Sequence, residues 1–144
     1  MTEVSKSLRM ASSALLLCLS GYTVAASGAT FEERRHLAQM AEETEPTRGY
    51  IYNKMFPAIG RTIAQAMQNC LERPEASIEP FSVVADLSQN GRLTRVAYEP
   101  RSNTAICFAT AISSLHAPPP PTLNEEPLPV VFDMEVKPER REAF

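Results

Sequence analysis

The chain has 144 residues and a formal net charge of -3. Such mild acidity disfavours binding to nucleic acid phosphates or to anionic lipid, because both need concentrated Lys and Arg. The length fits one domain with a modest core.

Residues 1–26 are predicted to form a cleavable secretory signal peptide. Lys6 and Arg9 precede an uncharged stretch over residues 10–30 that has a strongly apolar centre and ends in small residues. This is the three-part layout of an export signal. Small residues at the last and third-last positions favour cleavage after Ala26.

Two alternatives to simple cleavage remain open. About 20 uncharged residues can span a bilayer, so an uncleaved membrane anchor is one, although polar and small residues dilute the apolarity of this stretch. A lipoprotein signal at Cys18 is the other. Leu17 precedes that cysteine where a bacterial lipoprotein signal requires Gly, Ala or Ser, so we favour cleavage.

Cleavage after Ala26 leaves two cysteines, Cys70 and Cys107, in a mature chain with 12 basic and 16 acidic residues. An even cysteine count in an exported protein favours a disulfide over two free thiols. Closing a loop of 37 intervening residues is worth about 4 kcal/mol in the chain-entropy model. The sequence therefore predicts one disulfide that stabilises a small domain.

Residues 27–48 are predicted to form a peripheral helix and a linker. Thr30 and Glu33 have the spacing of a capping box, and a helix from Phe31 to about Glu43 follows. Its apolar content is thin. A second helix is predicted next in the chain. Its apolar residues recur at helical spacing in a stripe, which places Cys70 on the face that packs into the core. The residues of that stripe are Ile59, Ile63, Ala66, Met67 and Cys70.

Alternation over residues 81–87 predicts a strand, and Asn90-Gly91 predicts a tight hairpin turn. Leu93, Val96 and Tyr98 mark the returning strand, which Pro100 ends.

A helix follows over residues 103–117, with Ser102 or Asn103 as its cap. Its expected stripe is Ile106, Ala109, Ile112 and Leu115. Four prolines, Pro118 to Pro121, end this helix and form a stiff connector.

Alternation over residues 128–136 predicts a third strand, and Pro129 near its start suggests a sheet edge. The positions Val130, Phe132, Met134 and Val136 are expected to face inward. The positions Val131, Asp133 and Glu135 are expected to face solvent. Residues 139–144 are predicted to be a charged tail.

These elements predict an α+β fold, a small three-stranded antiparallel sheet packed against helices in the order helix, helix, hairpin, helix, strand. That order resembles the C-terminal domain of the TonB and TolA energy-transducing proteins over about residues 50–138, within a predicted domain of residues 49–138. The matching motifs are the hairpin over residues 85–96 and the cysteine-bearing helix at 106–111 with its proline-rich exit. Only about 20 residues separate the signal from Tyr50, so the resemblance is to a short form without the transducer anchor and spacer.

The resemblance implies a periplasmic or secreted module that binds an envelope or secreted protein by strand addition at a sheet edge. We expect Val131, Asp133 and Glu135 to border that edge, with the strand that starts at Phe81 as the alternative. A small exported inhibitor or assembly chaperone is the alternative function.

An enzyme is disfavoured. Only His36 and His116 can serve as near-neutral acid/base groups, and the sequence has no phosphate-binding loop or nucleophile elbow. We predict no cofactor, no metal, no nucleic acid partner, and no membrane association after signal cleavage.

Overall fold

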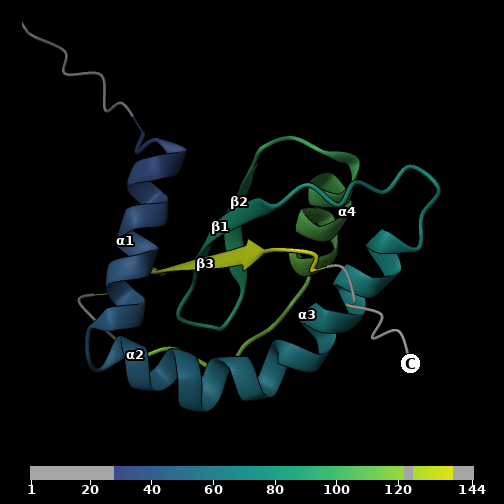
Figure 1. The fold of residues 1–144 in the computed structure, drawn as a ribbon. Coiled ribbons are helices and arrows are strands. Elements are labelled where there is room, and N and C mark those ends of the chain that lie inside the picture. The colour runs from purple at the N-terminus through teal and green to yellow at the C-terminus, as the bar shows by residue number, and fades with distance from the viewer. Residues whose placement is uncertain (1–27, 122–124, 138–144) are drawn as a thin grey trace, which may run out of the picture.

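The computed structural model describes residues 28–121 and 125–137 and shows an α+β fold with a three-stranded antiparallel sheet (Figure 1). This confirms the predicted class. The predicted signal peptide, residues 1–26, and the predicted tail, residues 139–144, lie outside the described residues. In chain order the elements are α1 (Phe31–Glu43), α2 (Thr47–Tyr50), the π-helical segment η1 (Ile51–Met55), α3 (Phe56–Leu71), β1 (Phe81–Leu87), β2 (Leu93–Glu99), α4 (Asn103–Ile112) and β3 (Leu128–Met134).

β1 and β2 form the predicted hairpin, whose turn depends on Gly91. This residue has a φ of +82°, which favours glycine because it has no Cβ. Its amide donates to the Ser88 carbonyl oxygen at 2.9 Å and closes the turn. A Cβ at this position would lie 1.9 Å from the Ala117 carbonyl oxygen. Gly91 therefore serves both the turn and the close approach of the segment that follows α4.

The strands lie in the order β2-β1-β3. β3 is an edge strand, as Pro129 predicts, and it ends at Met134, two residues before the predicted end. The strand that starts at Phe81 is β1, which is central and pairs on both sides. The prediction that this strand offers an alternative docking edge is therefore wrong. The second edge of the sheet is β2.

The inner face of the sheet packs against η1, α3 and α4 and forms the main core. The predicted stripe on α3 is confirmed, and its buried residues are Ile59, Ile63, Met67 and Cys70. The prediction for α4 needs correction. Phe108 and Ile112 are buried, but Ile106 is 44% exposed, and the helix ends at Ile112 rather than Ala117. A spacing of three residues drifts around the helix because one turn takes 3.6 residues.

α1 covers the opposite, outer face of the sheet. Ala38 has no exposed surface and packs with Val84 of β1 and Val131 of β3 in a second small core. The predicted capping box is present, since the Thr30 and Glu33 side chains each accept a hydrogen bond from the other's backbone amide. The helix expected to be peripheral therefore closes the sheet. The few apolar residues of α1 are enough for this packing, because the small side chain of Ala38 lets the helix backbone lie close to the sheet.

Two neighbouring arginines hold α1 on the outer face. Arg34 Nη2 lies 3.4 Å from Asp86 Oδ1 and donates to the Arg95 carbonyl oxygen at 2.7 Å. Arg95 Nη1 lies 3.1 Å from Asp86 Oδ2, a contact that is an ion pair without hydrogen-bond geometry. Arg35 Nη2 donates to Asp133 Oδ1 at 3.2 Å. The Arg34 and Asp86 side chains are only 11% and 10% exposed, so losing Asp86 leaves the largely buried charge of Arg34 without an ion-pair partner. Losing Arg34 leaves Asp86 with Arg95 as its remaining partner.

The docking of α1 predicts the effect of enlarging Ala38. We expect Ala38→Leu to lower the free energy of unfolding by about 1–3 kcal/mol, because the added atoms force the helix away from the sheet. Denaturant unfolding followed by circular dichroism measures this. His36→Leu, at an exposed position of the same helix, is the control and should stay within about 0.5 kcal/mol of the wild type. Equal midpoints for all three proteins would show that α1 does not pack on the sheet.

Candidate partner-binding surface

The β3 edge is partly enclosed by the path of the chain. α1 lies on the outer face and α3 packs on the inner face, so the chain between them passes from one face of the sheet to the other. α1 contacts β3 much more extensively than β1 or β2, and α2 follows it directly at the next corner (Figure 1). α1 therefore lies over the β3 side of the sheet, where a strand added to that edge would have to run alongside the helix.

The three predicted partner-binding residues have different environments. Val131 is 5% exposed, so the expectation that it faces solvent is wrong, because α1 covers it. The unbroken apolar run at residues 130–132 is the sequence signal for a strand covered on both faces. Asp133 is exposed, but it accepts hydrogen bonds from Arg35 and Ser82. Glu135 is exposed just beyond the end of β3.

β2 is the more accessible edge strand. One of its seven residues is buried, against four of seven in β3, so its side chains are far less enclosed. A bulge interrupts its pairing with β1 opposite Val84–Asp86, and Arg95 has a φ of +51° there. A bulge and a charged residue discourage unspecific pairing along an edge. Beyond the bulge, the stretch 97–99 pairs regularly with β1.

The position of Pro129 indicates which backbone groups of β2 point away from the sheet. Pro129 pairs with Asp86 and has no N–H, so we infer that this pair is not hydrogen-bonded. The direction of the backbone N–H and C=O groups alternates along a strand, so Asp86, Val84 and Ser82 of β1 all direct theirs toward β2. Val84 pairs there with Ala97, and Ser82 pairs with Glu99. Tyr98 lies between Ala97 and Glu99. Its N–H and C=O therefore point to the free edge.

The chain itself occupies one end of the β2 edge. Arg92, just before β2, forms an isolated antiparallel bridge with His116, while its carbonyl oxygen accepts a hydrogen bond from the Ser88 amide across the turn. The segment after α4 therefore lies along the edge beside the hairpin turn. The other end, near Glu99, has no such neighbour among the described residues. An extended segment can pair there.

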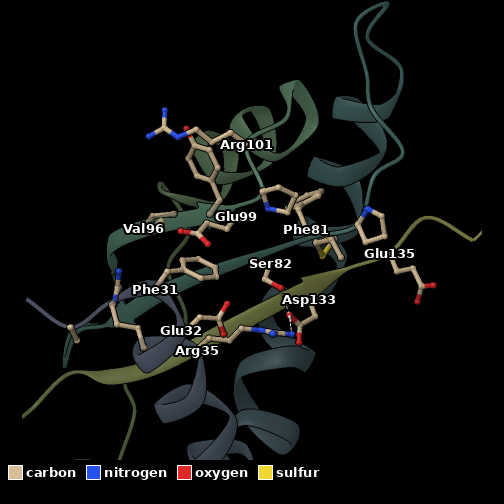
Figure 2. Close-up of a pocket in the computed structure, with 17 residues that line it drawn as sticks. Phe31, Glu32, Arg35, Phe81, Ser82, Val96, Glu99, Arg101, Asp133 and Glu135 are labelled. Carbon is tan, nitrogen blue, oxygen red and sulfur yellow. Dashed lines mark hydrogen bonds and ion pairs between the residues drawn. The ribbon is translucent and has the colours of Figure 1, made fainter.

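An open groove lies on the outer face beside α1, at the Glu99 end of β2 (Figure 2). α1 provides one wall, and all three strands contribute to the surface that it crosses. Six of the lining residues represent these elements, namely Phe31, Glu32, Arg35, Ser82, Ala97 and Asp133. Glu135 lines the groove at the β3 side. The groove therefore joins the β2 edge to two of the three residues that the sequence singled out.

The described residues, 28–121 and 125–137, contain no group of three or more His, Cys, Asp and Glu side chains that could hold a metal ion. Within the same ranges, no helix is both long enough and apolar enough to cross a membrane. His36 and His116 are exposed and belong to separate segments.

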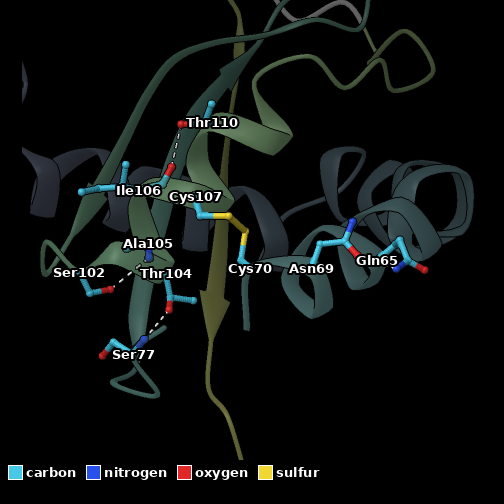
Figure 3. Close-up of a disulfide and its surroundings, with 10 residues drawn as sticks. All are labelled: Gln65, Asn69, Cys70, Ser77, Ser102, Thr104, Ala105, Ile106, Cys107 and Thr110. Carbon is cyan, nitrogen blue, oxygen red and sulfur yellow. Dashed lines mark hydrogen bonds between the residues drawn. A yellow bond between two sulfur atoms is a disulfide. The ribbon is translucent and has the colours of Figure 1, made fainter. Parts of the chain in front are cut away.

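The predicted disulfide joins Cys70, near the end of α3, to Cys107 in α4 (Figure 3). The two Cα atoms lie 5.8 Å apart. The Ser102 hydroxyl caps α4 by accepting a hydrogen bond from the Ala105 amide at 3.1 Å, which confirms one of the two predicted caps. The bridge links two helices of the inner face, so it lies away from the groove on the outer face.

Comparison with known proteins adds no assignment. No family model matches the chain, and neither a curated protein nor a solved structure matches it. The resemblance to the TonB and TolA C-terminal domains stays a prediction from the sequence, and the function is argued below from the surface itself.

The position of the disulfide predicts a stabilising role that is separate from binding. We expect the double variant Cys70→Ser, Cys107→Ser to lose about 2–4 kcal/mol of unfolding free energy, because the unfolded chain regains the entropy of an open loop. Denaturant unfolding with and without reductant measures this loss. Reductant should lower the midpoint of the wild type and leave the variant unchanged. An unchanged wild-type midpoint would contradict the prediction.

Glu42 on α1 predicts a pH dependence of stability. Burial raises the pKa of its carboxyl above the ordinary value of 4.5, and the nearby charges of Asp133 and Glu43 raise it further. The folded protein therefore holds this proton more tightly than the unfolded chain. The resulting stabilisation is present below the unfolded pKa and is lost as pH rises through the folded pKa.

We therefore expect Glu42→Gln to be more stable than the wild type at pH 7 and to lose this advantage as the pH falls below 4.5. Thermal unfolding between pH 3.5 and pH 7, at roughly half-unit steps, measures the difference across the ionisation range of a carboxyl group. Glu79→Gln, at an exposed position outside α1, is the control. A pH-independent difference for Glu42→Gln would contradict the assignment.

Proposed function

We propose that this protein is a non-enzymatic interaction module that captures an extended segment of a partner protein by strand addition at the β2 edge. The observation that carries the proposal is the exposure of β2, which has a single buried residue, Leu93, in an otherwise covered sheet. The stretch 97–99 beyond the bulge is regular. Main-chain hydrogen bonds to such an edge supply affinity without requiring a particular partner sequence.

The choice of β2 over β3 follows from steric access. A strand added to β3 must lie alongside α1, which contacts β3 extensively. At the β2 edge, the segment after α4 forms its bridge at Arg92, beside the hairpin turn. The bulge at Arg95 shortens the regular edge and so limits the captured segment to a few residues. Each added hydrogen bond contributes about 0.5–1.5 kcal/mol. A few main-chain hydrogen bonds give modest affinity and do not depend on the partner's sequence. Side-chain contacts must therefore provide the specificity.

The proposed setting is the bacterial cell envelope, in the periplasm or outside the cell. The predicted signal peptide supports export, and the disulfide fits an oxidising compartment. The resemblance to the TonB and TolA C-terminal domains supports the same class, since those domains meet outer-membrane or periplasmic partners. We propose an envelope or secreted protein as the partner.

Two substitutions at Tyr98 test the docking edge. We expect Tyr98→Pro to lose partner capture, because proline removes the outward N–H without taking a hydrogen bond from the ladder to β1. Tyr98→Val is the matched control, since it also lacks the ring but keeps the N–H, and it should retain capture. The measurement is affinity capture from an envelope extract, with quantitative mass spectrometry of the retained protein. Circular dichroism must first show that each variant is folded.

The same experiment includes Asp133→Pro, with Asp133→Asn as its control, to test the β3 edge. The proposal predicts that both Asp133 variants retain the partner. Loss of capture by Asp133→Pro, together with normal capture by Tyr98→Pro, would place docking on β3 instead. Equal capture by all the folded proline variants would contradict strand addition at either edge.

A further inference from the structure

We infer that the groove beside β2 selects a partner segment that carries basic side chains toward the outer face. This inference rests on the proposed function, because the segment that presents those side chains is the strand paired with β2. It names the chemistry of the partner, which main-chain pairing alone leaves open. The occupant is a short extended segment with Lys or Arg at alternate positions.

The charge balance of the groove favours a basic occupant. Glu32 on α1 and Glu99 on β2 are both exposed, and neither has an ion-pair partner among the described residues. The arginines on the α1 wall, Arg34 and Arg35, are already paired with carboxylates. Arg101 lies over the Tyr98 ring, 5.7 Å from its centroid. Glu135 lines the groove at the β3 side and is also without an ion pair in the described part of the chain. The groove therefore presents three unpaired negative charges, two of them on α1 and β2, while most of its positive charge is engaged.

The geometry places Glu99 where an added strand sends its outer-face side chains, and Glu32 lines the same groove from α1. Directly opposed residues on neighbouring strands have Cβ atoms about 5 Å apart, so an outer-face residue opposite Glu99 can pair with it. Ala97 is the small residue on the same face of β2, and it leaves room for a long side chain. The Phe31 ring packs against the small core beneath α1, and in the view of Figure 2 it lies between Glu32 and Glu99.

Both the apolar stem and the charged head of a lysine or arginine side chain suit this arrangement. Its methylene stem can pack along the Phe31 ring while its charged head reaches a carboxylate. On the other face of the added strand, the neighbours are Val96 and Tyr98, which are half-buried at the border of the main core. Apolar residues suit those positions. A strand with glutamate on its outer face would place like charges opposite Glu99, which is unfavourable.

The test uses three synthetic peptides with blocked ends as defined probes. Their sequences are Thr-Lys-Val-Lys-Val-Lys-Thr, the same sequence with Glu for Lys, and a neutral form with Gln for Lys. Each is titrated into the isotope-labelled protein, purified after export, and binding is followed by NMR chemical shifts. We expect the Lys peptide to bind about tenfold or more tightly than the Glu peptide at low salt. This preference should shrink as salt screens exposed charges.

Charge-removing variants locate the effect. We expect the double variant Glu32→Gln, Glu99→Gln to weaken binding of the Lys peptide several-fold and to leave binding of the Gln peptide unchanged. Glu135→Gln is the matched control. Glu135 also lines the groove, but it follows β3, which lies two strand spacings from β2, or about 10 Å. It should change the affinity for the Lys peptide little.

The outcomes separate this inference from the proposed function. Equal binding of the Lys and Glu peptides, with loss of both in Tyr98→Pro, would overturn basic selection and leave strand addition intact. A preference for the Lys peptide that survives in Tyr98→Pro would overturn strand addition and keep the charged groove. An effect of Glu135→Gln as large as that of the double variant would overturn the placement along β2. Failure of all three peptides to bind would overturn both proposals.

Discussion

The largely buried carboxylate of Asp86 is the constraint on which the architecture depends. It lies on the outer face of the central strand with 10% of its side chain exposed, and a buried charge without a partner costs several kcal/mol. Arg34 from α1 and Arg95 from β2 both pair with this carboxylate, and Arg34 also donates to the Arg95 carbonyl oxygen beside the bulge of β2. This contact fixes α1 across the sheet. Ala38 can then pack against the strands, and the sheet is covered on both faces.

The docking of α1 has unequal consequences for the two edges of the sheet. α1 contacts β3 far more extensively than β1 or β2, so a strand added to the β3 edge would have to run alongside this helix. β2 keeps its outward backbone groups and stays largely exposed. α1 also forms one wall of the groove that carries Glu32 and Glu99. One buried ion pair therefore helps to determine which edge is open and which charges surround it.

The local elements could be predicted from the sequence, whereas the role of α1 could not. Asn90-Gly91 predicts the hairpin because few residues adopt the backbone angles of its turn, and the even cysteine count predicts the pairing of Cys70 with Cys107. The docking of α1 depends on Arg34 and Asp86, which lie far apart in sequence, so no local pattern reveals it. The apolar run at residues 130–132 was the available signal that β3 is covered on both faces, but alternation suggested an exposed face there.

Amide hydrogen exchange measured by NMR on the native protein tests the unequal access to the two edges most directly. The two outward-pointing amides to compare are that of Tyr98 on β2 and that of Val131 on β3, because Val131 is 5% exposed beneath α1 and Tyr98 is only half-buried. We expect the Tyr98 amide to exchange at least about a hundredfold faster, through solvent contact without unfolding. Equal rates, or faster exchange at Val131, would contradict the assignment of β2 as the open edge.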